Sequence, residues 1–341
     1  MPESKFYHID ISGQLASVQT LEEALEISKT GGFIWLSYCE PTLEELSLLK
    51  EPLGLHPLSL EDCIDDIQIP KIEDFPGNTF ILFNAFHYSN KILAIEEVNL
   101  FIGTNFLVTT IRRGLSEKRL IENVVQIATN NVEKIKQGPA FLMHIFLDLI
   151  VDKKFETIEA MEDELDNAED TMLSKPADFN LGDLQYLRRD LLSIRKSLFH
   201  EREIFVKICR RDSPFIPEKA IVDFRDIYDH LANFFELTET FREIVTSLME
   251  MHLSLLNNQM AKAANQTNFI VRRLTLITTI FMPLTLLAGI GGMSEWSMMT
   301  DPANWKISYP LFVLGMVIIG AANYFFLKRL EKKDRENELK Q

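Results

Sequence analysis

Two long uncharged stretches near the C-terminal end constrain the fold of this chain more than any other feature. They run from Leu274 to Met293 and from Ile307 to Leu327, whereas charged residues recur every few positions elsewhere. A helix needs roughly twenty residues to cross the hydrocarbon core of a bilayer, and each stretch is that long. Because the linker between them is short, we predict a membrane-spanning helical hairpin. A pair of buried core helices is the alternative.

Basic residues flank this hairpin mainly on one side. Arg272 and Arg273 precede the first stretch, and the linker holds Glu295, Asp301 and one base, Lys306. Further bases follow the second stretch, among them Lys328, Arg329, Lys332, Lys333 and Arg335. Since Lys and Arg favour cytoplasmic loops, both termini are predicted to be cytoplasmic in a multi-pass protein of the cell (inner) membrane.

Composition excludes several function classes. The 50 acidic residues outnumber the 35 basic ones, for a net charge of −15, so no nucleic-acid partner is expected. The sequence contains no GxGxxG or GxxxxGK[ST] loop, so no nucleotide site is indicated. The seven histidines form no HExxH motif, and the three cysteines, Cys39, Cys63 and Cys209, are far apart. We therefore expect neither an enzyme nor a resident cofactor.

The part of the chain before the hairpin divides into two predicted regions. Residues 1–135 alternate strand-like and helix-like segments, with strands predicted over 31–39, 79–89, 98–103 and 105–111 and short Thr-capped helices after Thr20 and Thr42. Residues 136–267 are predicted to be helical. This is an α+β membrane protein, with an N-terminal α/β cytoplasmic domain and a long helical stalk.

The stalk is predicted from what the sequence lacks. No glycine or proline occurs from Glu218 to Met282, which favours one helix of roughly 100 Å that continues into the first span. Apolar residues at 3/4 spacing form a seam for helix packing, and these are Phe224, Ile227, Leu231, Phe234, Phe241, Val245, Leu248 and Leu255. A helix continuous from cytoplasm to membrane could transmit events in the cytoplasmic domain to the bilayer.

The same spacing predicts a polar face on the first span, within residues 268–293. It comprises small, polar or flexible residues between bulky apolar ones: Asn268, Val271, Thr275, Thr278, Met282, Thr285 and Gly289. Such residues also let helices pack closely, which is the alternative interpretation. One hairpin cannot enclose a channel, but several copies of this face could. Neutral oxygen ligands suit a strongly hydrated cation such as Mg²⁺.

Several motifs resemble one known family. The stretches LTLITTIFMPLTLLAGIGGM (274–293), LHPLSLEDCIDDIQIPKIEDF (55–75) and FRDIYDHLANFFELTETFREIV (224–245) are similar to segments of the CorA family of divalent-cation channels. The resemblance covers nearly the whole chain. It implies a funnel-shaped homopentamer in which the first span lines the pore and the second, residues 307–327, lies outside it, followed by the basic cytoplasmic tail 328–341.

The resemblance also implies particular site residues. Val271 and Leu274 fall on a hydrophobic constriction. The outer mouth falls on Gly291, Gly292, Met293, Ser294 and Glu295, beside the outer loop 294–306. Where the family usually has Tyr-Gly-Met-Asn, this chain has Gly291-Gly292-Met293-Ser294. Asp226 matches one partner of the family's intersubunit regulatory metal site, but Ser89 replaces the acid expected opposite it.

These features favour a passive Mg²⁺ channel gated by the cytoplasmic domain. Because a serine replaces the family's usual asparagine at the outer mouth, zinc, cobalt and nickel are alternative transported ions. A non-conducting membrane-anchored sensor or scaffold is the alternative of a different class. In that case Asn268→Leu or Thr285→Leu would leave cation flux unchanged.

Overall fold

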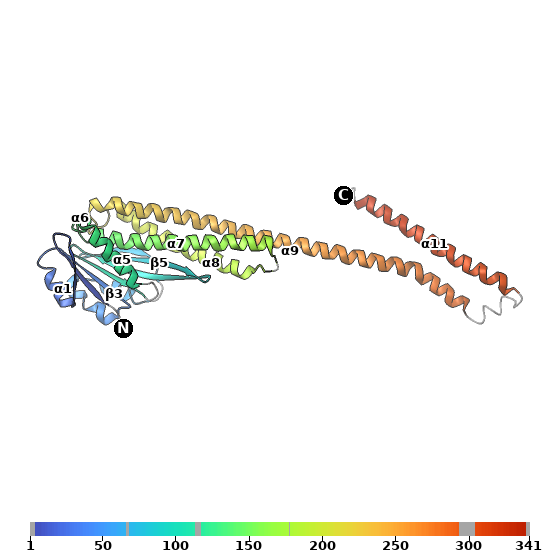
Figure 1. The fold of residues 1–341 in the computed structure, drawn as a ribbon, viewed down its shortest axis with the longest axis horizontal. Helices are drawn as coiled ribbons and strands as arrows, with labels where there is room; N and C mark the ends of the chain where they lie inside the picture. The colour runs from blue at the N-terminus through green and yellow to red at the C-terminus, as the bar shows by residue number, and fades with distance from the viewer. Residues whose placement is uncertain (1–3, 66–67, 113–116, 177, 293–303, 339–341) are drawn as a thin grey trace. The chain divides into compact units, whose positions relative to one another are not determined.

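The computed structural model describes residues 4–65, 68–112, 117–176, 178–292 and 304–338 (Figure 1). The chain divides into two compact units, Met1–His252 and Leu253–Gln341. Helix α9 (Ile221–Gly291) contributes to both. Each unit is described separately below.

The first unit contains a mixed seven-stranded sheet in the order β2-β1-β3-β7-β6-β5-β4. The strands are β1 (Lys5–Ile9), β2 (Leu15–Val18), β3 (Phe33–Cys39), β4 (Lys71–Asp74), β5 (Thr79–Ser89), β6 (Ile92–Ile102) and β7 (Phe106–Ile111). Strands β3 and β7 pair in parallel and the other described neighbours pair antiparallel. The predicted hairpin of residues 98–103 and 105–111 is confirmed as β6–β7, although β6 begins six residues earlier.

Short helices cover one face of this sheet. They are α1 (Leu21–Ile27), α2 (Leu43–Ser47), α3 (Lys50–Leu53) and α4 (Pro57–Asp62). Both predicted threonine caps are present: Thr20 Oγ1 accepts a hydrogen bond from the Glu23 N–H, and Thr42 forms a reciprocal capping box with Glu45. Their apolar residues pack on Phe80 and Leu82 of β5 and on the same face of β3 and β7.

Long helices cover the other face. After α5 (Glu117–Asn130) and α6 (Val132–Ile135) come α7 (Pro139–Ser174) and α8 (Leu181–Cys209), then a 3₁₀ turn, η1 (Glu218–Ala220). Figure 1 shows α7, α8 and the first part of α9 running side by side. Because side chains alternate along a strand, Phe83 of β5 points away from the short helices and contacts Phe205 of α8, with ring centroids 5.9 Å apart.

A charged pair is buried between the sheet and these helices. Lys154 of α7 donates a hydrogen bond to a carboxylate oxygen of Glu201 on α8, and both side chains are 0 % exposed. The Lys154 ammonium lies 3.7 Å from the centroid of the Phe83 ring and 4.5 Å from that of Phe86. The second carboxylate oxygen of Glu201 accepts hydrogen bonds from the Asn84 N–H and the Ser197 hydroxyl. Burial lowers the pKa of Lys154 to about 8, while the Glu201 carboxylate acts in the opposite direction.

The predicted stalk seam is confirmed. Helix α9 is continuous through the glycine- and proline-free stretch and through Pro283. Seven of the eight predicted seam residues are buried, from Phe224 to Leu248, and Leu255 is half-buried. The first part of α9 is therefore fixed by ordinary helix packing inside the first unit.

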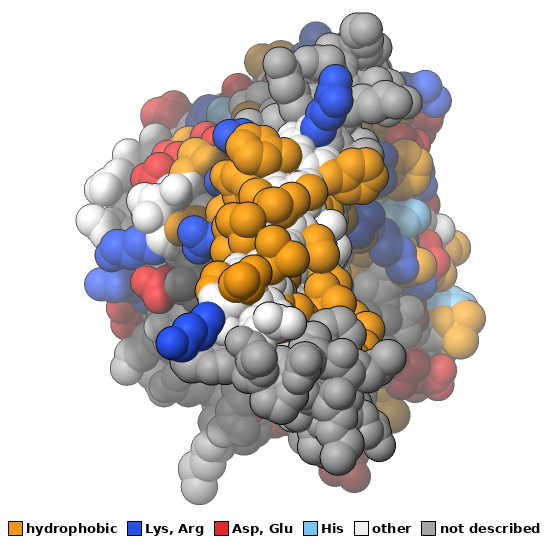
Figure 2. Space-filling view, turned by 90° about the vertical axis from the view of Figure 1, so that its right-hand side faces the viewer, with side chains coloured by type: hydrophobic (Ala, Val, Ile, Leu, Met, Phe, Trp, Pro, Cys, Tyr) orange, Lys and Arg blue, Asp and Glu red, His pale blue; other side chains and the backbone are white. Residues whose placement is uncertain are grey.

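The second unit is a helical hairpin made of the end of α9 and α11 (Trp305–Glu338). Both helices are long and apolar enough to cross a membrane, and their most apolar windows are not buried inside the single chain. A Cβ atom added to Gly291 would lie 2.7 Å from the Phe312 ring, and one added to Gly320 would lie 3.5 Å from a Leu284 methyl carbon. These glycines mark where the two helices touch. An end-on view shows hydrophobic side chains gathered in a band on the surface (Figure 2).

Candidate pore-lining face

Most residues of the predicted polar face are exposed on one side of α9. Val271 is 54 % exposed and Met282 is 69 % exposed, and the side chains of the other predicted residues from Asn268 to Thr285 are exposed as well. A Cβ atom added to Gly289 would meet no atom within 4 Å. At about 100° per residue, the positions from Asn268 to Gly289 lie along one side of the helix.

The opposite side of the same helix packs on α11. The half-buried residues there recur at helical spacing and are Leu276, Ile280, Leu284, Leu287 and Gly291. Their counterparts on α11 are Phe312, Gly315, Met316, Gly320, Asn323 and Leu327. Since α11 occupies one side of α9, the polar face is left accessible to other molecules. Periodicity distinguished the two sides of this helix only by residue type. The structure shows that one side packs on α11 and that the polar side does not.

The threonine hydroxyls on the polar face share one geometry. Thr275, Thr278 and Thr285 each donate a hydrogen bond of 2.8–2.9 Å to the backbone carbonyl four residues earlier. A hydroxyl that donates in this way keeps two lone pairs as acceptors. Water molecules bound to a cation direct their hydrogens outward, so acceptors are the groups that such a hydrated ion requires. The face therefore offers neutral acceptors and no fixed charge.

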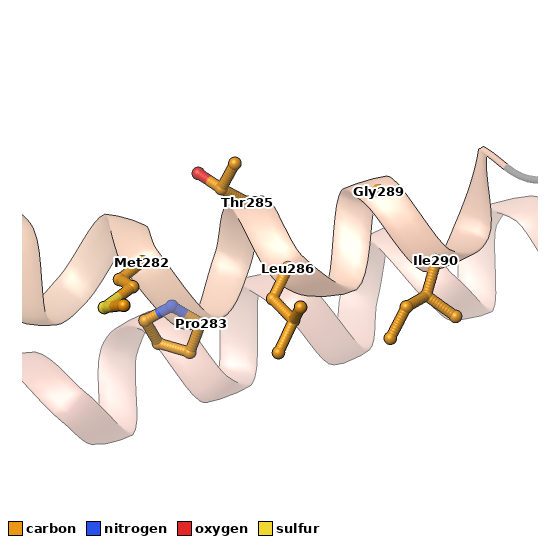
Figure 3. A pocket seen from close by; sticks show the side chains of 6 residues that line it. All are labelled: Met282, Pro283, Thr285, Leu286, Gly289 and Ile290. Atoms are coloured by element: carbon orange, nitrogen blue, oxygen red, sulfur yellow. The ribbon is translucent and has the colours of Figure 1, made fainter.

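A shallow hollow lies on this part of α9. It has a volume of about 870 Å³ and is lined by Met282, Pro283, Thr285, Leu286, Gly289 and Ile290. In Figure 3 the Thr285 hydroxyl points to one side of the helix, whereas Leu286 and Ile290 point to the other. Pro283 has no N–H, so the Thr279 carbonyl lacks its usual intrahelical donor near this hollow. The hollow is open, and all six of its lining residues belong to α9.

The predicted constriction and outer mouth fall at different positions on α9. Leu274 is 63 % exposed, next to Val271 on the accessible side. Gly291 faces the Phe312 ring of α11, and Gly292 is exposed at the end of the helix. The other predicted outer-mouth residues, Met293, Ser294 and Glu295, lie outside the described residues.

The two positions of the predicted regulatory site lie on different elements of the first unit. Asp226 is exposed on α9, and its carboxylate lies 3.7 Å from Nε2 of His230 one turn later. Ser89 is the exposed last residue of β5 and pairs with Ile92 across the hairpin. Within the turn between these two residues, Lys91 forms ion pairs with Glu164 of α7 and Asp183 of α8, at 2.7 and 3.0 Å. The Lys91 ammonium group therefore links the tip of the β5–β6 hairpin to α7 and α8.

Sequence reasoning missed the residues that join the two helices of the hairpin. Phe312, Gly320 and Asn323 all lie on the side of α11 that faces α9. The signal was present in the sequence, because Phe312, Met316, Gly320, Asn323 and Leu327 follow 3/4 spacing. Small residues at such positions allow close approach of membrane helices.

These features define a class of protein: an α/β domain with a long helical stalk that ends in a hairpin of two membrane-spanning helices. The family model described as "CorA-like Mg2+ transporter protein" matches residues 30–329. The chain belongs to this family, and it is a membrane protein.

Individual relatives agree with this assignment. The chain is 33 % identical over 284 residues to the cobalt/magnesium transport protein CorA of Thermotoga maritima, covering 82 % of this chain and 78 % of that one. It is 26 % identical over 292 residues to the cobalt/magnesium transport protein CorA of Methanocaldococcus jannaschii, covering 84 % and 88 %. The complete structure of the CorA magnesium transporter from Methanocaldococcus jannaschii has the same fold, with a TM-score of 0.68 at 24 % identity over 96 % of this chain and 97 % of that one.

Proposed function

We propose that several copies of this chain form a membrane pore that conducts hydrated divalent cations, Mg²⁺ first among them. The observation that carries the proposal is the accessible polar face of α9 from Asn268 to Gly289, which lies opposite the side occupied by α11. Supporting it, the relatives at 33 % and 26 % identity are named cobalt/magnesium transport proteins.

The pore is built from one α9 helix per copy, with α11 on the outside. A single hairpin encloses no channel, and the exposed apolar surface of both helices needs further helices or lipid to cover it. We propose a homopentamer, as the family resemblance implies, with residues 1–267 in the cytoplasm, spans 268–293 and 307–327 in the cell membrane, and both termini inside. The cluster of bases next to Arg272 and after Leu327 supports this orientation.

Ion passage along this face requires no catalytic group. Acceptor lone pairs of Thr275, Thr278 and Thr285 would hold the water shell of the ion, and Val271 with Leu274 would form the dry constriction that closes the pore. Glu295 and Asp301 in the outer loop would raise the local cation concentration. The driving force is the electrochemical gradient.

Gating would be transmitted by α9, which is one continuous helix from the stalk seam to the pore face. Buried residues fix the first part of α9 within the first unit. A change in the packing of that part would then move the constriction formed by Val271 and Leu274. Cytosolic metal that binds the Asp226 carboxylate is one source of such a change. Ser89 stands where the family resemblance implies a second acid for this site, so that second carboxylate is missing at this position.

Flux into liposomes tests this function. Purified protein reconstituted into vesicles loaded with a magnesium-sensitive dye should admit Mg²⁺ down its gradient, without nucleotide and without a pH gradient. The same assay with cobalt, nickel and zinc sets the ion preference. Zinc uptake without Mg²⁺ uptake would overturn the magnesium assignment, and no uptake of any of the four ions would favour a membrane-anchored sensor or scaffold.

A further inference from the structure

Charge is distributed very unevenly between the two units. Residues 1–252 contain 25 Lys and Arg against 44 Asp and Glu, a net charge of −19. Residues 253–341 contain 10 against 6, a net charge of +4. Between Leu253 and Arg273 there is no acidic residue. The second unit is thus basic within an acidic protein, and its bases are not spread evenly along it.

Most of these bases gather at one end of the hairpin. Two contacts give the register of the antiparallel helices: Gly291 lies against Phe312, and Leu284 lies against Gly320. In both pairs the two residue numbers add up to nearly the same value, 603 and 604, so residues whose numbers add up to about 604 lie level with each other. Continued along the helices, this register places Arg273 level with residue 331. Lys328 and Arg329 are therefore within about one helical turn of Arg273 along the hairpin. At the opposite end, the linker contains the single base Lys306.

Two of these cations lie over exposed aromatic rings. The Arg273 guanidinium carbon is 5.5 Å from the centroid of the Phe269 ring, and the Lys328 ammonium is 5.9 Å from that of the Tyr324 ring. Phe269 is 61 % exposed and Tyr324 is 49 % exposed. Each helix thus presents a positive charge directly next to an accessible apolar ring, an arrangement suited to the boundary between headgroups and acyl chains.

We propose that this end of the hairpin is a binding site for the phosphate groups of anionic phospholipids, with Arg273 and Lys328 as the principal ligands. The site offers positive charge to the headgroup, while the exposed Phe269, Ile270 and Phe325 side chains contact the first carbons of the acyl chains. A soluble phosphate would gain the charge contacts alone. Anionic lipid gains both kinds of contact, so the site distinguishes it from neutral lipid.

Native mass spectrometry of the full-length protein in detergent tests the proposal. The protein is titrated with phosphatidylglycerol, with phosphatidylcholine, and with phosphatidylglycerol in the presence of millimolar inorganic phosphate. Each base near an anionic headgroup is worth about a fivefold change in binding. The variant Arg273→Gln/Lys328→Gln should therefore bind phosphatidylglycerol about 25-fold more weakly, with binding of phosphatidylcholine unchanged.

Two matched variants separate charge from folding. Arg273→Lys/Lys328→Arg keeps both charges and should bind phosphatidylglycerol within about twofold of the wild type. Lys306→Gln removes a charge at the other end of α11 and should have no effect. Equal binding of the two lipids by the wild type, undiminished phosphatidylglycerol binding by the double Gln variant, or an equal loss in Lys306→Gln would overturn the proposal. Displacement of the lipid by inorganic phosphate would show a site for soluble anions and would overturn it as well.

Discussion

The same apolar residue types are buried in one unit of the chain and exposed in the other. In the first unit, large side chains such as Trp35, Phe83 and Phe224 are 0 % exposed, and charged residues cover the outside. In the second unit, Leu274, Met282 and Leu311 are 63 %, 69 % and 68 % exposed. One chain completes the first core by itself. The second unit has its apolar surface outside, as expected for helices that cross a membrane.

Polar groups are also treated differently in the two units. In the first unit, Lys154 and Glu201 are buried as an ion pair. The Lys154 ammonium also lies against an aromatic ring, and the Glu201 carboxylate accepts a hydrogen bond from the Asn84 N–H. In the second, the polar groups of the spans are neutral hydroxyls and amides, and the bases are confined to the ends of the helices. A bilayer penalises charge in its interior more than a protein core with a fixed counter-ion does. This contrast can be tested by substitutions in either unit.

The largest effect is expected for the buried pair of the first unit. Lys154→Met leaves the Glu201 carboxylate buried without its cation, so the free energy of unfolding should fall by about 3–5 kcal/mol. Replacing both residues, as Lys154→Met/Glu201→Leu, should restore most of this loss. Denaturant unfolding of the full-length protein in detergent measures it.

The neighbouring lysine serves as the control for that experiment. Lys153 is exposed and pairs with Glu156 at the surface, so Lys153→Met should change stability by less than about 0.5 kcal/mol. If Lys154→Met were as mild as Lys153→Met, the pair would not be the fixed, desolvated contact described here.

A smaller effect is expected at the contact between the two helices of the second unit. Gly291→Ala places a methyl group 2.7 Å from the end of the Phe312 ring, and this overpacking should destabilise the hairpin by about 1–3 kcal/mol. Gly289→Ala, two residues earlier, meets no atom within 4 Å, so it should leave the thermal midpoint unchanged or raise it slightly, since alanine favours the helix over glycine. Adding Phe312→Leu should rescue Gly291→Ala. Equal midpoints for the two single alanine variants would argue against this contact.

The smallest effect is expected for the surface ion pairs at the tip of the β5–β6 hairpin. Lys91 bridges Glu164 and Asp183, but its side chain is 56 % exposed, so solvent screens both pairs. Lys91→Gln should lower the free energy of unfolding by about 0.2–1 kcal/mol, and 1 M salt should remove the difference. Lys29→Gln, which breaks one exposed pair between Glu26 of α1 and the residue just after the helix, sets the baseline. A loss above 2 kcal/mol would mean that the tip holds the helices together.

Sequence patterns predicted the parts of this protein in which one signal dominates. The inner strands β3, β5 and β7 are rich in β-branched and aromatic residues, and β5 has the predicted bounds. Strands β1, β2 and β4 were missed because they are only four or five residues long and include polar residues, and β2 and β4 also form the two edges of the sheet. The long helix was predicted because nothing interrupts it before Pro283, and that proline lies inside the helix without ending it.

Other features depend on contacts that no local pattern contains. Lys154 looks like a surface residue by type, although its spacing from Ile150 and Ile158 places it on the buried side of α7. The polar face of α9 was predicted from residue types, but its position opposite α11 follows only from the register of the hairpin.

Two adjacent threonines provide the most direct test of the central claim, that one side of α9 lines a cation pore. Thr278 and Thr279 donate the same kind of hydrogen bond to the carbonyl four residues earlier, at 2.8 and 2.7 Å, but they point about 100° apart around the helix. Thr278 belongs to the predicted polar face, whereas Thr279, which is also exposed, lies just beyond the edge of that face. In the liposome assay, Thr278→Leu should reduce Mg²⁺ flux at least tenfold, while Thr279→Leu should keep it within about twofold of the wild type. Equal flux through the two variants, or a greater loss in Thr279→Leu, would contradict the account.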